Sequence, residues 1–185
     1  MSASPVATLP LPNGARLEVV IADLLRETTD AIVNAANGHL AHGGGVAAAI
    51  ARAAGPELDR ESEALVQAGG AIPTGEAVVT TAGRLRFQGV VHAVGPRLGE
   101  GDEGRKLQQA LVAAFLRAHE RGWRSLSFPA VSSGIFAVPP EVCARAYVSA
   151  ARRFFDEHPE TSLTLLRLCL FEGAVADAVR REVNG

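Results

Sequence analysis

The sequence predicts an α/β domain in which helices cover both faces of a central, largely parallel sheet. Two observations support this fold class. Short β-branched and apolar runs alternate along the chain with longer segments of helical spacing. The chain also has 185 residues, 48% of them apolar, which suffices for the core of one domain. Because strands that alternate with helices of this length need crossover connections, the strands should lie parallel inside and the helices outside.

Six segments have the composition of strands. They are Arg16–Ile21, Ala31–Asn34, Glu76–Thr81, Val90–Val94, Ser125–Phe128 and Thr164–Leu170. Residues 1–14, which precede the first of them, are rich in Pro, Ser and Gly. We therefore expect a flexible N-terminal lead-in over residues 1–14 and a single domain over residues 15–185.

The longer segments have helical spacing. In Glu103–Arg121, for example, apolar side chains recur at intervals close to the 3.6-residue period of a helix. Pro139 and Pro140 begin another such segment, where proline is tolerated. The predicted helices are Val46–Ala54, Glu57–Ala68, Glu103–Arg121, Pro140–Asp156 and Ala174–Val183.

Composition argues against several classes of function. The net charge of −2 offers no basic surface of the kind that binds nucleic acid, and no stretch is apolar enough for a membrane span. Cys143 and Cys169 form no CxxC pair, and no histidine–carboxylate cluster has the spacing of metal ligands. The N-terminus lacks the pattern of a secretory signal. We therefore expect a cytoplasmic monomer that needs no metal or cofactor.

Ligands of parallel sheets bind beyond the carboxyl ends of the strands, and the loop after Ala31–Asn34 has the composition of such a site. It contains Asn37 and three consecutive glycines, Gly43, Gly44 and Gly45, at the entry to a predicted helix. Glycine lets the backbone approach a ligand, and the free N–H groups of the first helical turn favour an anion. The glycines alone could be a flexible connection, but Asn37 can offer a donor and an acceptor to a sugar.

A second small-residue turn follows Ser125–Phe128. Its residues Ser132–Phe136 can present further backbone N–H groups to the same anion. Ile135 could simply plug the core, and Phe136 could provide a wall for a ribose. Two such loops would clamp a diphosphate without basic side chains. The dinucleotide fingerprint G-x-G-x-x-G and the P-loop lysine are both absent, which disfavours a Rossmann dehydrogenase and a P-loop nucleotidase.

Three motifs occur in the order typical of one known family. The first joins Asp30–Asn37 to His42–Ala47, the second is Val91–Pro96, and the third is Ser133–Phe136. Through them the chain resembles the macrodomain family over nearly its whole length. The resemblance implies a three-layer α/β/α sandwich around a mixed, mostly parallel sheet of about six strands. It also implies a cleft for ADP-ribose.

The resemblance assigns roles to individual residues. Asp23 would accept a hydrogen bond from the adenine amino group, Leu24 would offer its backbone N–H to that ring, and Phe171 would stack on it. Asn37 would hold the distal ribose, with Phe136 packed against it. The candidate ligand-binding set is Asp23, Leu24, Asn37, His42, Gly43, Gly44, Gly45, Val46, Ser132, Ser133, Gly134, Ile135, Phe136 and Phe171, and the candidate catalytic residues are Asn37, Gly45 and Phe136.

Several of these residues have a simpler structural explanation. Asp23 could be an ordinary helix N-cap, and Phe171 could belong to the core. His92 lies within a strand and fits a buried, hydrogen-bonded histidine better than a catalyst. His42 could position the distal ribose indirectly, or it could be an ordinary exposed loop histidine.

Departures from the family leave the activity open. Ala47 stands where one hydrolase branch has an aspartate, and Lys106, the only lysine, is too distant to act as the catalytic lysine of another branch. The run that begins at His42 looks more like the viral and vertebrate multi-domain macrodomains. That group includes both hydrolases of mono-ADP-ribose and pure readers.

The mechanism that the residues favour is assisted by the substrate, because no nucleophile–base pair is visible. A water between an α-phosphate oxygen and Asn37 would attack C1 of the distal ribose and release a protein carboxylate. The implied partners are ADP-ribose and proteins that carry mono-ADP-ribose on Asp or Glu. A non-catalytic ADP-ribose reader is one alternative, and hydrolysis of O-acetyl-ADP-ribose or ADP-ribose 1″-phosphate is another.

Overall fold

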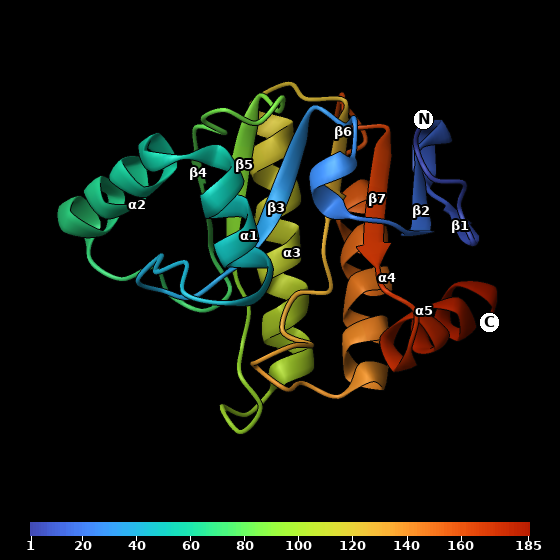
Figure 1. The fold of residues 1–185 in the computed structure, drawn as a ribbon. Coiled ribbons are helices and arrows are strands. Elements are labelled where there is room, and N and C mark those ends of the chain that lie inside the picture. The colour runs from blue at the N-terminus through green and yellow to red at the C-terminus, as the bar shows by residue number, and fades with distance from the viewer.

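A computed structural model describes residues 1–185 as a mixed sheet of seven strands in the order β1-β2-β7-β6-β3-β5-β4 (Figure 1). The five central strands are parallel to one another, and β1 and β4 run antiparallel at the two edges. The strands are β1 (Ala7–Pro10), β2 (Arg16–Ile21), β3 (Ala31–Ala36), β4 (Ala77–Thr80), β5 (Gly89–Val94), β6 (Ser125–Phe128) and β7 (Leu165–Leu170).

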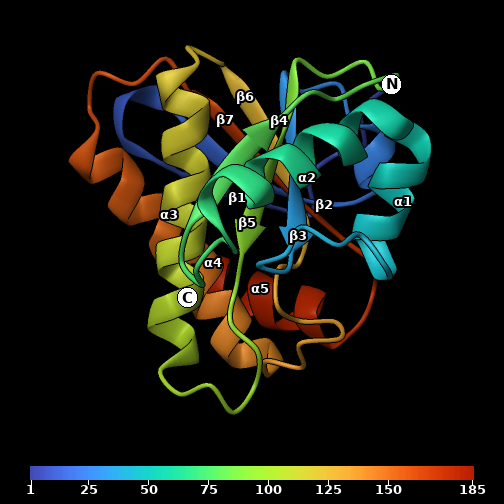
Figure 2. The ribbon, with the colours of Figure 1, turned by 90° about the vertical axis from the view of Figure 1, so that its left-hand side faces the viewer.

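Five helices complete the outer layers of the sandwich. They are α1 (Gly45–Ala54), α2 (Pro56–Gly69), α3 (Glu103–Glu120), α4 (Pro140–Glu157) and α5 (Ala174–Asn184). Helices α3, α4 and α5 share one hydrophobic core with the sheet, and α1 and α2 share a second core with its opposite face (Figure 2). None of these helices combines the length and apolarity needed to span a bilayer. The predicted three-layer fold is confirmed.

The alternation of side chains along each central strand fills both cores. In β3, Val33 packs on the side of α3 and α4, while Ile32 packs on the side of α1. Val91 and Val90 of β5 divide in the same way. Because these strands are buried on both faces, they read in the sequence as nearly continuous apolar runs.

The N-terminal prediction was wrong for one segment. Residues 1–14 were expected to form a flexible lead-in, but Ala7–Pro10 pairs with Arg16–Val19 as the edge strand β1. Ala7 and Leu9 are buried, whereas Thr8 and Pro10 are exposed. This alternation is only four residues long and ends at a proline. A proline is tolerated on an edge strand, but its presence hides the strand signal.

A buried ion cluster joins β2 and β7. Arg167 pairs with Glu18 and, at 2.5 Å, with Glu27, and its Nη2 donates a 2.9 Å hydrogen bond to the Ala3 carbonyl oxygen. Burial alone would raise the pKa of Glu18, but hydrogen bonds and charge from Arg16 and Arg167 lower it. The cluster therefore keeps Glu18 ionised and anchors the first residues of the chain to this face.

Candidate functional site

A cleft of about 770 Å³ lies beyond the carboxyl ends of the parallel strands. Since these strands all end at one edge, the loops that follow them are brought together there. Of the fourteen predicted ligand-binding residues, the structure places thirteen in the lining of this cleft. They are Asp23, Leu24, Asn37, Gly43, Gly44, Gly45, Val46, Ser132, Ser133, Gly134, Ile135, Phe136 and Phe171.

The order of the strands sets the order of the site along the cleft. Asp23 follows β2 at one end, Phe171 follows β7, and the loops after β6 and β3 form the middle. Arg97 follows β5 at the other end. Four strand spacings separate β2 from β5, or about 19 Å. The cleft therefore suits an elongated ligand that is recognised by different groups along its length.

The first loop ends at the N-terminus of α1. Gly44 is the N-cap residue, and no side chain caps the helix. Gly45 begins the helix in the left-handed region, with φ of +57°, a conformation that glycine adopts at little cost. The first turn therefore presents N–H groups, with the positive end of the helix dipole, to the cleft.

The second loop is a tight turn held by its own hydrogen bonds. The Val138 N–H donates to the Ser132 carbonyl oxygen at 3.0 Å, and Ser132 has a φ of +67°. A Cβ atom on Gly95 would lie 2.2 Å from the Ser132 Oγ atom, so only glycine lets this turn pack against the segment after β5. The second motif thus supports the third motif structurally.

Two apolar side chains stand at the rim of the cleft. Ile135 and Phe171 are each 82% exposed, so neither belongs to the core. The interpretation of Ile135 as a core plug and of Phe171 as a core residue is therefore wrong. Exposed apolar side chains at the mouth of a cleft are well placed to cover a bound ligand.

The carboxamide of Asn37 is turned toward its own loop. Its Nδ2 donates to the Ala41 carbonyl oxygen at 2.8 Å, and its Oδ1 accepts from the Ala41 N–H at 3.0 Å. Each group still has one unused hydrogen-bonding position, because an amide nitrogen carries two hydrogens and the oxygen two lone pairs. Asn37 can therefore close the loop and face a ligand at the same time.

His42 does not line the cleft, so the prediction that it binds ligand is not supported by its position. Its Nε2 pairs with Ser62 Oγ at 3.0 Å, and its ring stacks on His92 at a centroid distance of 5.2 Å. Asn34 Nδ2 lies 3.0 Å from His92 Nδ1 and 3.4 Å from His42 Nδ1. Ser62 on α2 draws the ring away, a contact that no local pattern could indicate.

His92 is a buried structural histidine, as its place within a strand indicates. Its Nε2 also bonds Thr80 Oγ1 at 2.8 Å, and its side chain is completely buried. Burial, reinforced by the neighbouring His42, lowers the pKa of His92 to about 3. Burial likewise lowers the pKa of His42. Both rings are therefore neutral hydrogen-bonding groups at neutral pH.

Two further groups decide which chemistry the cleft can perform. Asp23 Oδ1 accepts a 3.0 Å hydrogen bond from the Leu25 N–H, so Asp23 does cap a short helical turn (Leu24–Arg26) while it lines the cleft. Cys169 also lines the cleft, but burial raises the pKa of its thiol well above the usual range. The thiol stays protonated and is a poor nucleophile.

Arg97 is the charged cleft residue that the sequence analysis did not predict. It is the only lysine or arginine in the lining, and its guanidinium carbon lies 4.7 Å from the centroid of the Phe136 ring. The available signal was its position, one residue after the Val91–Pro96 motif at the end of a parallel strand. Because backbone N–H groups suffice to bind a diphosphate, the two glycine-rich loops did not indicate a cation in the site.

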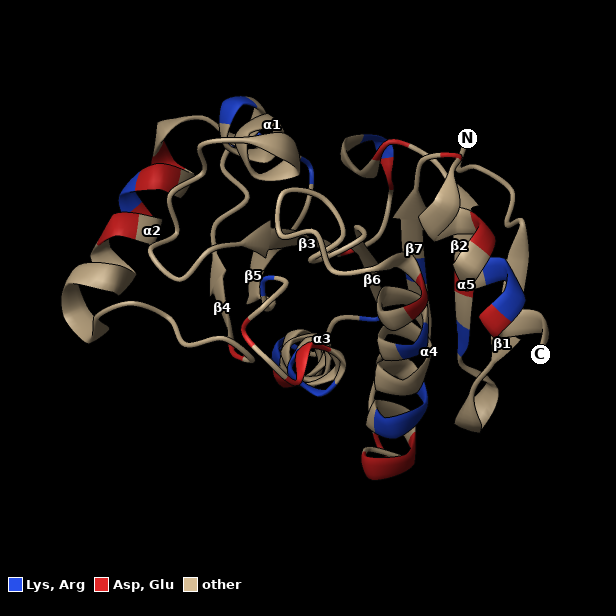
Figure 3. Ribbon diagram, turned by 90° about the horizontal axis from the view of Figure 1, so that it is seen from below, with Lys and Arg blue, Asp and Glu red and all other residues tan.

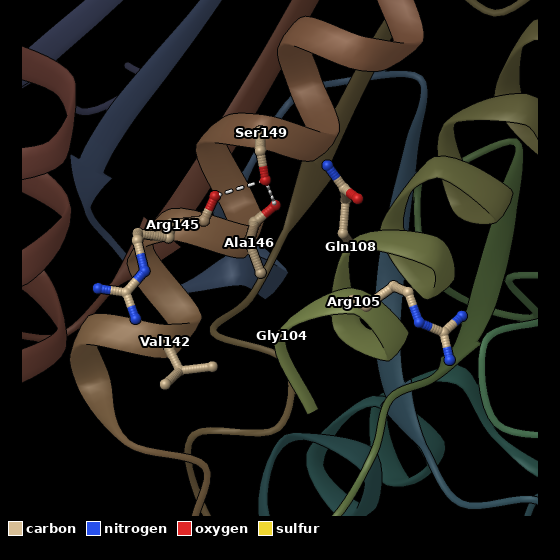
Figure 4. A pocket seen from close by; sticks show the side chains of 7 residues that line it. All are labelled: Gly104, Arg105, Gln108, Val142, Arg145, Ala146 and Ser149. Carbon is tan, nitrogen blue, oxygen red and sulfur yellow. Dashed lines mark hydrogen bonds between the residues drawn. The ribbon is translucent and has the colours of Figure 1, made fainter. Parts of the chain in front are cut away.

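A second cavity, of about 230 Å³, lies between α3 and α4. Arg105 and Arg145 line it, but their guanidinium groups point to opposite sides (Figure 4). Ser149 Oγ is engaged with the Arg145 and Ala146 carbonyl oxygens. The charged side chains of this groove do not converge. Nor does the chain bring three or more His, Cys, Asp or Glu side chains together in a way that could hold a metal ion.

The fold and the cleft define an α/β domain in which two backbone loops line one cleft at the carboxyl edge of the parallel strands. The family model described as "Macro domain" matches residues 33–147. The chain belongs to this family. The match includes both loops of the cleft and Arg97.

Relatives extend the similarity beyond the matched region. An uncharacterised protein of Thermotoga maritima is 49% identical over 159 residues, which are 85% of this chain and only 26% of that relative. The chain thus spans about a quarter of that protein. An O-acetyl-ADP-ribose deacetylase of Escherichia fergusonii is 40% identical over 146 residues, 78% of this chain and 82% of the relative.

Solved structures agree with the observed fold. The Oceanobacillus iheyensis macrodomain with ADP superposes with a TM-score of 0.87 at 30% identity, covering 96% of this chain and 95% of that chain. The Trypanosoma brucei macrodomain in complex with ADP-ribose gives a TM-score of 0.79 at 30% identity, covering 89% of this chain and 68% of that chain.

Proposed function

We propose that this chain binds ADP-ribose in the cleft and removes single ADP-ribose groups from Asp or Glu side chains of proteins. The observation that carries the binding proposal is the convergence of two backbone loops on one cleft. The loops offer main-chain N–H groups, one set at a helix N-terminus, which suits a diphosphate. The ADP and ADP-ribose in the two related macrodomain structures support the same ligand class.

The strand order supports one direction for the proposed ligand in the cleft. Asp23 and Phe171, after β2 and β7, would hold the adenine. The diphosphate would lie between the loops after β6 and β3. The distal ribose would then reach Asn37 and Phe136 near the β5 end of the cleft. This sequence of groups matches the order of adenine, diphosphate and ribose in ADP-ribose.

The hydrolysis follows from the same placement. A water donates hydrogen bonds to an α-phosphate oxygen and to the free lone pair of Asn37 Oδ1. Its oxygen forms a bond to C1 of the distal ribose as the bond from C1 to the protein carboxylate breaks. The electron pair leaves with the carboxylate, and the water proton passes to the phosphate oxygen. Orientation and fixed donors supply the rate gain.

One alternative activity has a specific observation in its favour. The Escherichia fergusonii relative is named an O-acetyl-ADP-ribose deacetylase, so the small ester is a second candidate substrate. A pure reader is the third possibility, because Ala47 offers no carboxylate beside the glycine loop. All three proposals share the ADP-ribose cleft and differ in whether, and at which bond, water attacks.

Two measurements test the proposal. Titration calorimetry with ADP-ribose should show saturable binding, and a time course with a Glu-linked mono-ADP-ribosylated protein should show release of ADP-ribose. Binding without release would identify a reader. Release of acetate from O-acetyl-ADP-ribose alone would identify a deacetylase, and absence of binding would reject the whole proposal.

A further inference from the structure

Arg97 gives the cleft a charge polarity. It is the only cation in the lining, as Asp23 is the only acid, and the two follow strands at opposite ends of the site. In the proposed orientation Asp23 faces the adenine, so Arg97 stands beyond the distal ribose. By strand order, the positive charge therefore lies on the side of the distal ribose and not on that of the adenine, where it can meet a group carried on C1 of this ribose.

The guanidinium of Arg97 is held in place and is free to bind. It packs over the face of Phe136, and the backbone next to it is tied to the same loop by a 2.8 Å hydrogen bond from the Leu98 N–H to the Phe136 carbonyl oxygen. Arg97 forms no ion pair, in contrast to Arg105, which pairs with Asp102. An arginine that stacks on a ring keeps its planar fork of donors for an oxyanion.

We propose that Arg97 binds an oxyanion carried on, or released from, C1 of the distal ribose and makes the site selective for such substrates. This inference rests on the proposed function. As water attacks C1, the breaking bond leaves its electron pair on a carboxylate or phosphate oxygen, and Arg97 receives that oxyanion through paired N–H donors. Arg97 thereby stabilises the negative charge that develops on the leaving group.

The surroundings of Arg97 favour a compact anion within the cleft over a long acidic peptide outside it. Glu100 and Asp102 follow in the same loop, and Glu103 is the first residue of α3. Glu103 Oε1 accepts hydrogen bonds from the N–H groups of Gly99 and Gly101, which fixes its carboxylate in the loop. A run of acidic residues beside the modified side chain would be repelled by these carboxylates, whereas the only acidic side chain in the lining, Asp23, lies at the opposite end of the cleft from Arg97.

The test compares two ligands in three proteins. Calorimetry measures the affinities of ADP-ribose and ADP-ribose 1″-phosphate for the wild type, Arg97→Gln and Arg105→Gln. Arg105 is the matched control because it is an exposed arginine outside the cleft. The wild type should prefer the phosphate by about tenfold or more, and Arg97→Gln should reduce this ratio to about one. Arg105→Gln should keep the wild-type ratio.

A second experiment tests whether Arg97 also acts on a carboxylate leaving group during turnover, and not only on a bound phosphate. With a Glu-linked mono-ADP-ribosylated protein, Arg97→Gln should lower kcat by about tenfold or more with a smaller change in KM, and Arg97→Lys should recover part of the loss. An unchanged ligand ratio and an unchanged kcat would overturn this inference while leaving ADP-ribose binding intact. Absence of ADP-ribose binding to the wild type would instead reject both proposals.

Discussion

The Cδ1 atom of Ile135 lies 3.3 Å from the position that a Cβ atom on Gly44 would occupy. The two loops of the cleft therefore touch, although they follow different strands and are about ninety residues apart in the chain. Ile135 is otherwise exposed, and its side chain extends from one loop of the cleft toward the other. We refer to this approach of the two loops as the bridge, and under the proposed function it lies beside the bound ligand.

The bridge predicts a kinetic effect for Ile135→Ala. Removing the exposed side chain should speed the dissociation of ADP-ribose and weaken its affinity by about three- to tenfold, because interface changes act mainly on dissociation. The melting temperature should hardly move, since surface substitutions change stability little. Stopped-flow dissociation measures the effect, with Val6→Ala as an exposed apolar control outside the cleft. An unchanged dissociation rate would mean that Ile135 does not cover the ligand.

The conformation of Gly45, rather than lack of space, should make it irreplaceable. Apart from its chain neighbours and the backbone of its own helix, no atom lies within 4 Å of a Cβ built on Gly45, but its φ of +57° is strongly unfavourable for a β-branched residue. Gly45→Val should therefore move the first turn of α1 and abolish detectable ADP-ribose binding. Gly44 is extended, and the methyl group of Gly44→Ala would press only on the exposed Ile135 side chain, which can move aside, so this variant should bind within about tenfold of the wild type. Equal losses in both variants, measured by calorimetry, would contradict this explanation.

Asn37→Ala should reduce turnover far more than binding. The carboxamide orients the attacking water, a contribution that can be worth about a hundredfold or more in rate, while the diphosphate loops provide most of the affinity. Because Asn37 also holds Ala41, Asn37→Asp is the matched variant that keeps the bond from the Ala41 N–H. If kcat and ADP-ribose affinity fall together in both variants, Asn37 only shapes the loop.

Phe171 should contribute to affinity without contributing to stability. Stacking of a base on an aromatic ring is worth about 1–3 kcal/mol, so Phe171→Ala should weaken ADP-ribose binding by about 5- to 150-fold. Its ring is exposed, so the free energy of unfolding should not change appreciably. Ribose 5-phosphate, which lacks adenine, should bind equally to both proteins. A similar loss of affinity for this probe would place Phe171 away from the base.

The parts of the fold and site that the sequence predicts are those controlled by local patterns. Strands β2 to β7 and all five helices have clear periodicity, and the loops after β3 and β6 have compositions that suit close backbone approach. Since parallel strands end at one edge of the sheet, the loops that follow them could be predicted from the sequence to lie close together in space. The glycines of these loops could likewise be predicted to allow close backbone approach, because backbone conformation is a local property.

The missed features depend on partners distant in sequence. His42 faces Ser62 on α2, and Arg97 is aligned by Phe136 of another loop. Strand β1 is stabilised by its pairing with β2 and by a half-buried face, although its own four residues include a proline. In each case the direction of a side chain or the pairing of a short segment is decided by tertiary contacts that override the local signal.

Figure 3 shows Lys, Arg, Asp and Glu positions distributed along the helices. The lining of the cleft contains only two charged residues, Asp23 and Arg97. The salt dependence of binding should therefore be modest. The slope of affinity against ionic strength should stay well below that of proteins that make many phosphate contacts through Lys and Arg. Calorimetry with ADP-ribose at low and high salt measures this slope, and a steep one would show that cations outside the lining contribute.

The His92 network predicts how stability depends on pH. Burial lowers the pKa of His92 to about 3, so between this value and the ordinary pKa of histidine the unfolded chain binds a proton that the folded chain does not. The stabilisation is fully present above the ordinary histidine pKa and falls with decreasing pH, by up to about 1.4 kcal/mol per pH unit. Urea unfolding of the wild type should show this loss between about pH 6.5 and pH 4. His92→Gln keeps a hydrogen-bonding side chain at this position but cannot be protonated, so its stability should fall less steeply over the same range. Parallel pH dependences in the two proteins would show that other groups, and not His92, destabilise the fold in acid.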